Sequence, residues 1–299
     1  VRADQTTDYY EITHRAGVLD ILSGTATPIL GYDGIAPGPT IRAKRGRRVV
    51  VQHTNHLAVP TAVHLHGGVT PSDSDGFPTD VIAPGTSRAY VYPNDQPAAT
   101  LWYHDHAMHH AGRNVYTGLA GLYLVHDDEE RALRLPDGPF DVPLLVQERS
   151  VRSDGALAYD TDHNIGALGD IILVNGVPWP RMEVCAPKYR FRVVTGANAS
   201  VFRLGLSSGR PLVQIATDAG LLPTPVESAS IPLAMAERVE LVIDFSTYPI
   251  GSRVVLRNLM ADGPRGDIMC FDVVCAERDP SELPERLVAT ERIPVAAAV

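Results

Sequence analysis

Short runs rich in Val, Ile, Thr and Tyr recur along the whole chain, several with alternating hydrophobic and polar positions, and glycine and proline bound them. This pattern predicts β-strands joined by turns. The strands expected in the first half are 48–57, 61–69, 88–94, 99–106 and 118–127. Those expected in the second half are 141–151, 170–180, 188–197, 202–208, 211–220, 238–246, 252–259 and 269–276. Only 229–241 has a composition that favours a helix. The pattern predicts an all-β fold of two antiparallel sandwiches or barrels.

A charged, turn-rich segment, "DDEERALRLPDG" at 127–138, separates the two sets of strands. We therefore predict one domain over residues 1–134 and a second over 135–278. The tail, 279–299, contains strand-breaking prolines and is interpreted as a connector.

Composition narrows the possible functions. The net charge of −9 argues against a nucleic-acid surface, and we expect the small basic cluster at 42–48 to be a solvated turn. No apolar run is long enough to span a membrane, so no membrane association is expected. The first residues do not have the form of a signal peptide, although a signal removed before Val1 would leave no trace. The chain has only three cysteines, an odd number, which does not indicate a disulfide framework. This favours a reducing, cytoplasmic location.

Two His-x-His pairs are the candidate chemistry. Residues i and i+2 of a strand point to the same face, so His64 and His66 share one face, and His104 and His106 share another together with Trp102. If the two strands meet, four imidazoles converge, and imidazole binds copper, zinc, iron and nickel, with copper favoured at equal availability. A single pair on a strand has a more ordinary interpretation as packing or surface histidines, but two pairs in β-contexts favour a metal site.

The other histidines are weaker candidates. We expect His109 and His110 to lie in the loop after the second pair, although they could extend the site. The remaining histidines are interpreted as surface or packing residues: His14, His53, His56, His126 and His163. Asp105 points away from the two histidines beside it, which leaves a solvated position and a role in supporting the ligands equally open.

Several segments together resemble the multicopper oxidases, in particular the bacterial spore-coat laccase, bilirubin oxidase and phenoxazinone synthase branch. These are "DGIAPGPTIRAKRGRRVVVQHTN", "HLHGGVTPSDSDGFPTD", "LWYHDHAMHHAGRNVYTGLAGLYLVHD" and "ILVNGVPWPRMEV", with "QIATDAGLLPTPV", "LAMAERVELVIDFS" and "DIMCFDVV" further on. The resemblance covers nearly the whole chain and implies two cupredoxin-like Greek-key domains. It also implies a share in a trinuclear copper centre that reduces dioxygen to water.

The resemblance also implies roles for individual residues. By motif position His64 would bind the type 2 copper, His66 and His104 one type 3 copper, and His106 the other. Asp75 falls where this branch carries an acidic residue that helps to deliver protons, while its local sequence, Asp-Gly, equally fits an ordinary turn.

The family's third cupredoxin domain, with its blue-copper site, has no counterpart in the motifs. A blue-copper site needs a cysteine thiolate with two histidines, and no histidine follows position 163. We therefore expect type 2 and type 3 copper ligands only, with no type 1 site. The missing ligands would come from a C-terminal cupredoxin domain or a second chain, and the oligomeric state stays open.

Three functions follow from these observations. The first is a laccase-like oxidase that passes electrons from a small aromatic reductant, a phenol or an arylamine, to dioxygen once a type 1 copper domain completes it. The second is a cupredoxin scaffold or binding module without redox chemistry. The third is a smaller site of one or two copper or zinc ions, because catalytic zinc commonly uses three protein ligands and an open position.

Overall fold

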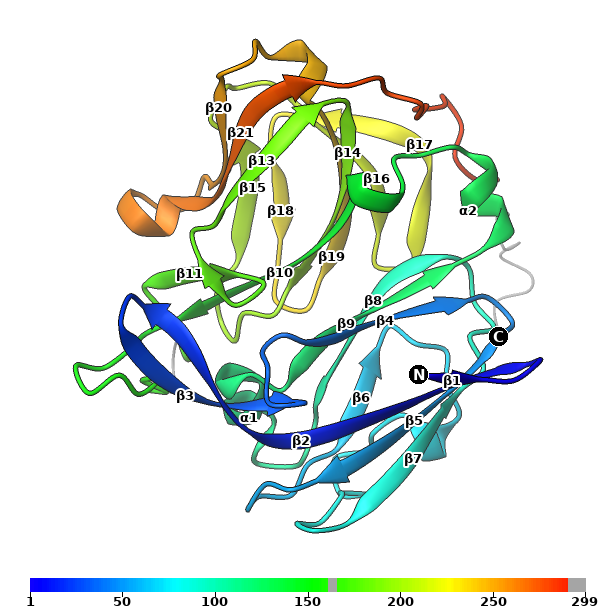
Figure 1. The fold of residues 1–299 in the computed structure, drawn as a ribbon, viewed down its shortest axis with the longest axis vertical. Helices are drawn as coiled ribbons and strands as arrows, with labels where there is room; N and C mark the ends of the chain where they lie inside the picture. Colours follow the sequence, from blue (N-terminus) through cyan, green and yellow to red (C-terminus); the bar gives the residue numbers. More distant parts are fainter. Residues whose placement is uncertain (161–165, 290–299) are drawn as a thin grey trace, which may run out of the picture.

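The computed structural model describes residues 1–160 and 166–289, and β-strands make up most of it (Figure 1). The all-β class predicted from the sequence is confirmed. None of its helices, within the described ranges, is long and apolar enough to cross a membrane.

Strands up to His126 form two sheets. The first has the order β1-β2-β5-β7, with β3 beside β2, and its strands are β1 (Arg2–Ala3), β2 (Thr7–Leu22), β3 (Thr25–Tyr32), β5 (Arg48–Asn55) and β7 (Ser87–Tyr92). The second has the order β4-β9-β8-β6, and its strands are β4 (Gly38–Lys44), β9 (Ala120–His126), β8 (Ala99–Asp105) and β6 (Val63–His66). Buried side chains from both sheets, Val51, Leu65, Tyr90 and Leu101 among them, form one core between the sheets, which we call the first sandwich.

Strands from Asp141 onward form two further sheets, which enclose a separate core and make the second sandwich. One has the order β12 (Val177–Pro178), β11 (Ile171–Val174), β10 (Asp141–Arg149), β14 (Lys188–Thr195), β19 (Arg238–Asp244), β16 (Leu212–Thr217), β17 (Gly220–Ser228). The other has the order β13 (Arg181–Ala186), β21 (Asp267–Ala276), β20 (Arg253–Asn258), β15 (Phe202–Leu206), β18 (Ile231–Leu233). Across residues 1–160 and 166–289, no ladder joins a strand of one sandwich to a strand of the other. The exact boundaries, 1–134, 135–278 and 279–299, stay predictions.

Helical segments are short and lie in the connections. They are α1 (Ala111–Thr117), α2 (Asp128–Ala132) and single 3-10 turns at Ser72–Ser74, Gly138–Phe140, Phe245–Thr247 and Gly263–Gly266. The prediction of a helix at 229–241 is wrong, because this stretch contains β18, a turn and most of β19. Pairing of β19 with β14 and β16 outweighs the helix propensity of its Ala, Met and Glu residues. In the charged break, Asp127 caps α2 by accepting a hydrogen bond from the Glu130 amide at 2.7 Å.

A disulfide joins Cys185 on β13 to Cys275 on β21, and Cys270 is a free thiol. This single disulfide was not predicted from the sequence, although one bond is not the disulfide framework that the cysteine count argues against. Spacing could not reveal the pair, because 90 positions separate the two residues and only the β13–β21 ladder brings them together. With two of the three cysteines paired, the cysteines no longer favour a reducing compartment, and the cellular location remains a prediction.

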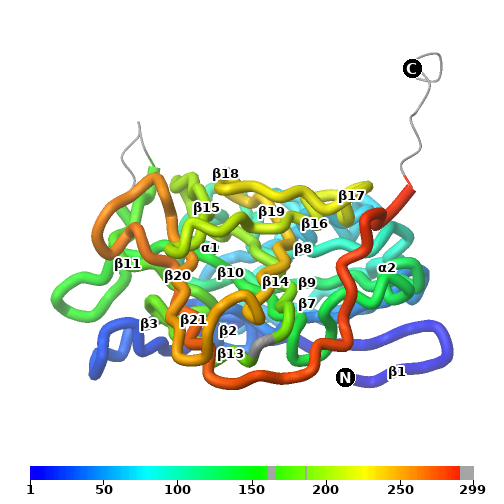
Figure 2. Tube along the Cα trace, turned by 90° about the horizontal axis from the view of Figure 1, so that it is seen from above, coloured from blue at the N-terminus to red at the C-terminus, as the bar shows by residue number. Residues whose placement is uncertain are grey.

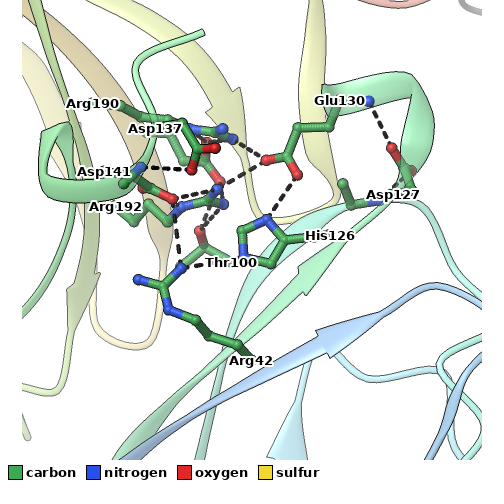
Figure 3. A network of polar contacts seen from close by, with 12 residues as sticks. Arg42, Thr100, His126, Asp127, Glu130, Asp137, Asp141, Arg190 and Arg192 are labelled. Carbon is green, nitrogen blue, oxygen red and sulfur yellow. Dashed lines mark hydrogen bonds and ion pairs between the residues drawn. The ribbon is translucent and has the colours of Figure 1, made fainter. Parts of the chain in front are cut away.

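A buried ion network joins the sandwiches (Figure 3). Arg192 on β14 is fully buried, and its guanidinium contacts Asp141 at 2.7 Å, Glu130 at 2.9 Å and Glu240 at 3.0 Å. Glu240 in turn accepts a hydrogen bond of 2.7 Å from the hydroxyl of Thr100 on β8. The second sandwich is thereby tied to the central strand β8 of the first.

The segment after β21 crosses the second sandwich and reaches the loop after α2, as the red trace of Figure 2 shows. Glu282 forms a 2.6 Å ion pair with Arg134, and its amide donates to the Arg134 carbonyl at 2.8 Å. Leu283 and Leu287 pack against a hydrophobic cluster that includes Leu135. The described part of the predicted connector, up to residue 289, thus lies on the body of the protein, and 290–299 lie outside the described residues.

Candidate metal centre

The register of β6 and β8 brings the two histidine pairs together. His64 lies opposite His104, and His66 lies opposite Trp102, in an antiparallel ladder. The odd-numbered neighbours, such as Leu65 and Tyr103, point into the core of the first sandwich. Because side chains alternate along a strand, the histidines point to the other face of the sheet, which the second sandwich partly covers.

The four imidazoles form one cluster. The ring of His64 lies 5.4 Å from those of His66 and His104 and 5.1 Å from that of His106, between centroids. One ring nitrogen each from His64, His66 and His104 lies within 4.8 Å of the other two, a spacing that can hold a metal ion. His66 Nδ1 and His104 Nε2 are 3.3 Å apart.

Backbone carbonyls orient two of these rings. His64 Nδ1 lies 2.8 Å from the Asp75 carbonyl, and His104 Nδ1 lies 2.9 Å from the Asp105 carbonyl. A carbonyl only accepts, so each Nδ1 carries the proton and each Nε2 keeps a lone pair. A hydrogen bond of this kind to the outer nitrogen is the usual support of a metal-binding histidine.

Burial keeps the imidazoles of His66, His104 and His106 neutral. Burial lowers the pKa of His104 to about 3, and burial, followed by the charge of Arg238, lowers the pKa of His66 to about 4. Burial also lowers the pKa of His106. Neutral imidazole is the form that binds metals, so these nitrogens are available as ligands near pH 7.

The cluster lines an open pocket of about 320 Å³ between the sandwiches. Trp102 forms one wall, and its ring lies 4.2 Å from that of His104 and 5.5 Å from that of His66. His106 Nδ1 is buried without a hydrogen-bond partner among the described residues. A bound metal ion would satisfy such a nitrogen, so the donors in this pocket fit copper, and they also fit zinc.

Asp105 supports the site from the opposite face. Its carboxylate is fully buried and accepts hydrogen bonds from the Ala62 amide at 2.9 Å, the Ala107 amide at 3.2 Å and the Asn114 side chain at 3.0 Å. The solvated position considered from the sequence is therefore wrong. Burial raises the pKa of Asp105 to about 6. The carboxylate ties together the segment before β6, the turn after His106 and α1.

Asp75 lies beside the cluster. Its half-exposed carboxylate is 3.3 Å from His64 Nδ1 and accepts a 3.2 Å hydrogen bond from the Thr70 hydroxyl. Asp75 ends the short 3-10 turn at Ser72–Ser74, and Gly76 follows with a positive φ. Asp75 therefore lies in a turn, as its local sequence indicates, and is also close to His64.

Most other histidines lie away from the cluster. His109 is exposed in a turn, and His110 precedes α1. His14 and His53 are buried, and a 2.9 Å hydrogen bond joins them. His56 is exposed and His126 contacts Glu130, while His163 lies outside the described residues.

The second sandwich also contributes residues to the site, which could not be predicted from the sequence. Ala197, Asn198 and Ala236 line the metal pocket, and Arg238 packs against Gly67, directly after His66. Nothing in the local sequence marks these residues, because only the packing of β14 and β19 against β8 brings them to the site.

Comparison with known proteins agrees with this geometry. Residues 15–130 match the family model of the multicopper oxidases. The chain is 38% identical to the laccase of Bacillus subtilis, covering 97% of this chain and 66% of the laccase. It is 42% identical to the bilirubin oxidase of Albifimbria verrucaria, covering 77% of this chain and 42% of that enzyme.

Solved structures agree as well. A variant of the McoA multicopper oxidase of Aquifex aeolicus superposes with a TM-score of 0.89 at 30% identity, covering 98% of this chain and 69% of that one. The match confirms the cupredoxin-like fold expected from the sequence. The chain spans about two thirds or less of the length of these curated relatives.

Proposed function

The chain belongs to the multicopper oxidase family, and from this we propose that it supplies part of the copper centre of a laccase-like oxidase. The complete enzyme would oxidise phenols or arylamines and reduce dioxygen to water once a type 1 copper domain is present. The observation that carries the proposal is the cluster of ring nitrogens of His64, His66 and His104, each within 4.8 Å of the others.

Copper, when bound, would supply the one-electron redox steps that oxygen reduction requires. The residues that would hold it are assigned by motif position: His64 for the type 2 ion, His66 and His104 for one type 3 ion, and His106 for the other. The hydrogen bonds from Nδ1 of His64 and of His104 to the carbonyls of Asp75 and Asp105 support metal binding through the Nε2 atoms.

Asp75 is the candidate for moving protons. Its carboxylate is exposed to solvent on one side and lies 3.3 Å from His64 Nδ1 on the other. A half-exposed carboxylate beside a metal-ligand candidate could take a proton from water and hold it on a carboxyl oxygen for delivery to the site, which is the role of a general acid.

The partners of the chain follow from the same proposal. Dioxygen and a small aromatic reductant are the substrates, and a C-terminal cupredoxin domain or a second chain supplies the remaining ligands and the entry point for electrons. The relatives are longer than this chain, which supports a further domain. The absence of nucleic-acid and membrane partners remains an expectation from charge and composition.

The test is copper content and oxygen uptake with a phenolic reductant, measured on the chain with and without a complementing type 1 copper domain. We expect bound copper in both cases and uptake only with the domain present. Bound copper without uptake in the complemented protein would reject the oxidase, and no bound copper at all would favour the scaffold interpretation.

A site for a single ion is the second candidate. Three imidazoles around an open pocket are a ligand set that zinc or copper enzymes also use. Metal titration distinguishes the single-ion site from the oxidase. A single-ion site saturates at one equivalent of copper or zinc, and the protein shows no oxygen uptake even with the complementing domain.

A further inference from the structure

Arg238 of the second sandwich lies at the end of the β6–β8 ladder. The ladder stops at the pair His66–Trp102, while β8 continues for three residues, from Leu101 back to Ala99. Backbone groups of these residues have no partner on β6. Arg238, from β19 of the second sandwich, reaches this point: its Nε donates to the Thr100 carbonyl at 3.2 Å.

The same guanidinium packs against the residue after His66. A Cβ atom placed on Gly67 would lie 2.2 Å from Arg238 Nη2, so only glycine leaves room for it. Gly67 also has a φ of +84°, a conformation that glycine adopts at little cost. Arg238 therefore packs against the turn that follows His66 and at the same time hydrogen-bonds to the strand that carries His104.

Arg238 is itself held firmly. Its side chain is 5% exposed, and it forms a 2.9 Å ion pair with Asp218. Nη1 and Nη2 also donate to the carbonyls of Ala236 and Asp218. A planar guanidinium with this many fixed partners has little freedom to move.

We propose that Arg238 is a positioning residue for His66, through which the second sandwich helps to set the geometry of the metal centre in the first. The inference rests on the proposed function only in that the ligands positioned are those of the copper site. Arg238 is not a ligand: it acts by fixing Gly67 and Thr100, and with them the distance between the two histidine strands.

The substitutions that test this are Arg238→Lys, which keeps the charge but loses the planar fork, and Arg238→Met, which loses both. Arg190→Lys is the matched control. Arg190 is a buried arginine of the same interface, paired with Glu130 and Glu240, and in the described structure it makes no hydrogen bond or ion pair to β6, β8 or Gly67. A purely structural role predicts that both lysine variants lose stability alike and that neither disturbs the histidines.

Two readouts are needed on the full 299-residue chain. The first is the affinity for Cu(II) in competition with a chromophoric chelator. Loss of a residue that supports a metal ligand typically weakens metal binding about 10–100-fold. We expect a loss of this size in Arg238→Met, a smaller loss in Arg238→Lys and unchanged affinity in Arg190→Lys. The second is the NMR signal of the His66 ring in the metal-free chain, which we expect to shift in both Arg238 variants only.

The outcomes separate the inference from the proposed function. Wild-type affinity in both Arg238 variants, or an equal loss in Arg190→Lys, overturns the positioning role while leaving the copper site intact. If the wild-type chain binds no copper, the proposed function fails and the His66 signals decide. A shift in both Arg238 variants but not in Arg190→Lys supports the inference, and unchanged signals or an equal shift in Arg190→Lys overturn it. If Arg238→Met does not fold, Arg238→Lys decides both readouts.

Discussion

Replacing Arg192 with methionine removes the centre of the ion network that joins the two sandwiches (Figure 3). The guanidinium is fully buried and contacts carboxylates of Asp141, Glu130 and Glu240. In the wild type, Arg190 and Arg192 face these three carboxylates, and the half-exposed Arg42 lies 3.7 Å from Asp141. The variant leaves Arg190 as the one buried guanidinium beside Glu130 and Glu240, and only the half-exposed Arg42 beside Asp141.

The expected cost follows from that imbalance. Removing one partner of a buried ion pair leaves an uncompensated buried charge and typically costs about 3–5 kcal/mol. At about 2 °C per kcal/mol for a chain of this size, the melting temperature should fall by roughly 6–10 °C. The control is Arg181→Met, because Arg181 pairs with Asp272 at the surface with a side chain 60% exposed. Exposed pairs contribute about 1 kcal/mol or less.

The effect should also depend on pH. The positive charges of Arg190 and Arg192 hold the pKa of Glu240 below its usual value, against the opposing effect of burial, and the pKa of Glu130 is also lowered. A carboxylate with a lowered folded-state pKa stabilises the protein above its unfolded-state pKa, and that contribution is lost as the pH falls through the folded value. The difference between wild type and Arg192→Met should therefore shrink as the pH falls below about 4.5.

The assay is urea unfolding followed by far-UV circular dichroism at pH 7 and at several acidic values. A loss below about 1 kcal/mol at pH 7, similar to that of Arg181→Met, would refute the argument that the network stabilises the interface. A difference that grows on acidification would refute the assigned sign of the pKa shifts.

Three further changes have defined outcomes. Asp105→Ala leaves the Ala62 amide buried without an acceptor, so the free energy of unfolding should fall by about 2–3 kcal/mol in urea titrations. An unchanged urea midpoint would contradict a stabilising role of the Asp105 carboxylate. Replacing Cys185 and Cys275 by serine should cost about 2–4 kcal/mol, measured against wild type with and without reductant, and equal stability in the absence of reductant would exclude the disulfide in solution. Asp75→Asn should leave copper content unchanged but slow oxygen uptake by the complemented enzyme, and wild-type uptake would remove Asp75 from proton delivery.

Local pattern was enough to predict β5 to β9, most strands of the second sandwich and the direction of the paired histidines, but the strand predictions missed β1 to β4, β13, β17 and β18. Alternation along β8 places His104 and Trp102 on one face, and the distance of 4.2 Å between their ring centroids agrees with it. The assignment of the four histidines to copper ions stays a prediction, since the structure supplies the geometry of the cluster and not the identity of the ion.

Features that depend on packing between distant segments could not be predicted. For Asp105 the sequence could not decide between a solvated position and a role in supporting the ligands. Alternation along the strand predicts which face the side chain is on, but not that the core of the first sandwich covers this face. Arg238 lies in a stretch for which composition favoured a helix, and its contacts with Gly67 and Thr100 exist only because β19 packs on β8. The disulfide was missed for the same reason.

Pulsed electron paramagnetic resonance of Cu(II) added to the chain tests most directly whether the paired imidazoles bind copper. The wild-type chain should show the modulation of remote imidazole nitrogens, and the double variant His64→Ala, His104→Ala should lose it together with most of its copper. Equal copper content and equal nitrogen modulation in the double variant would contradict a copper site at this cluster.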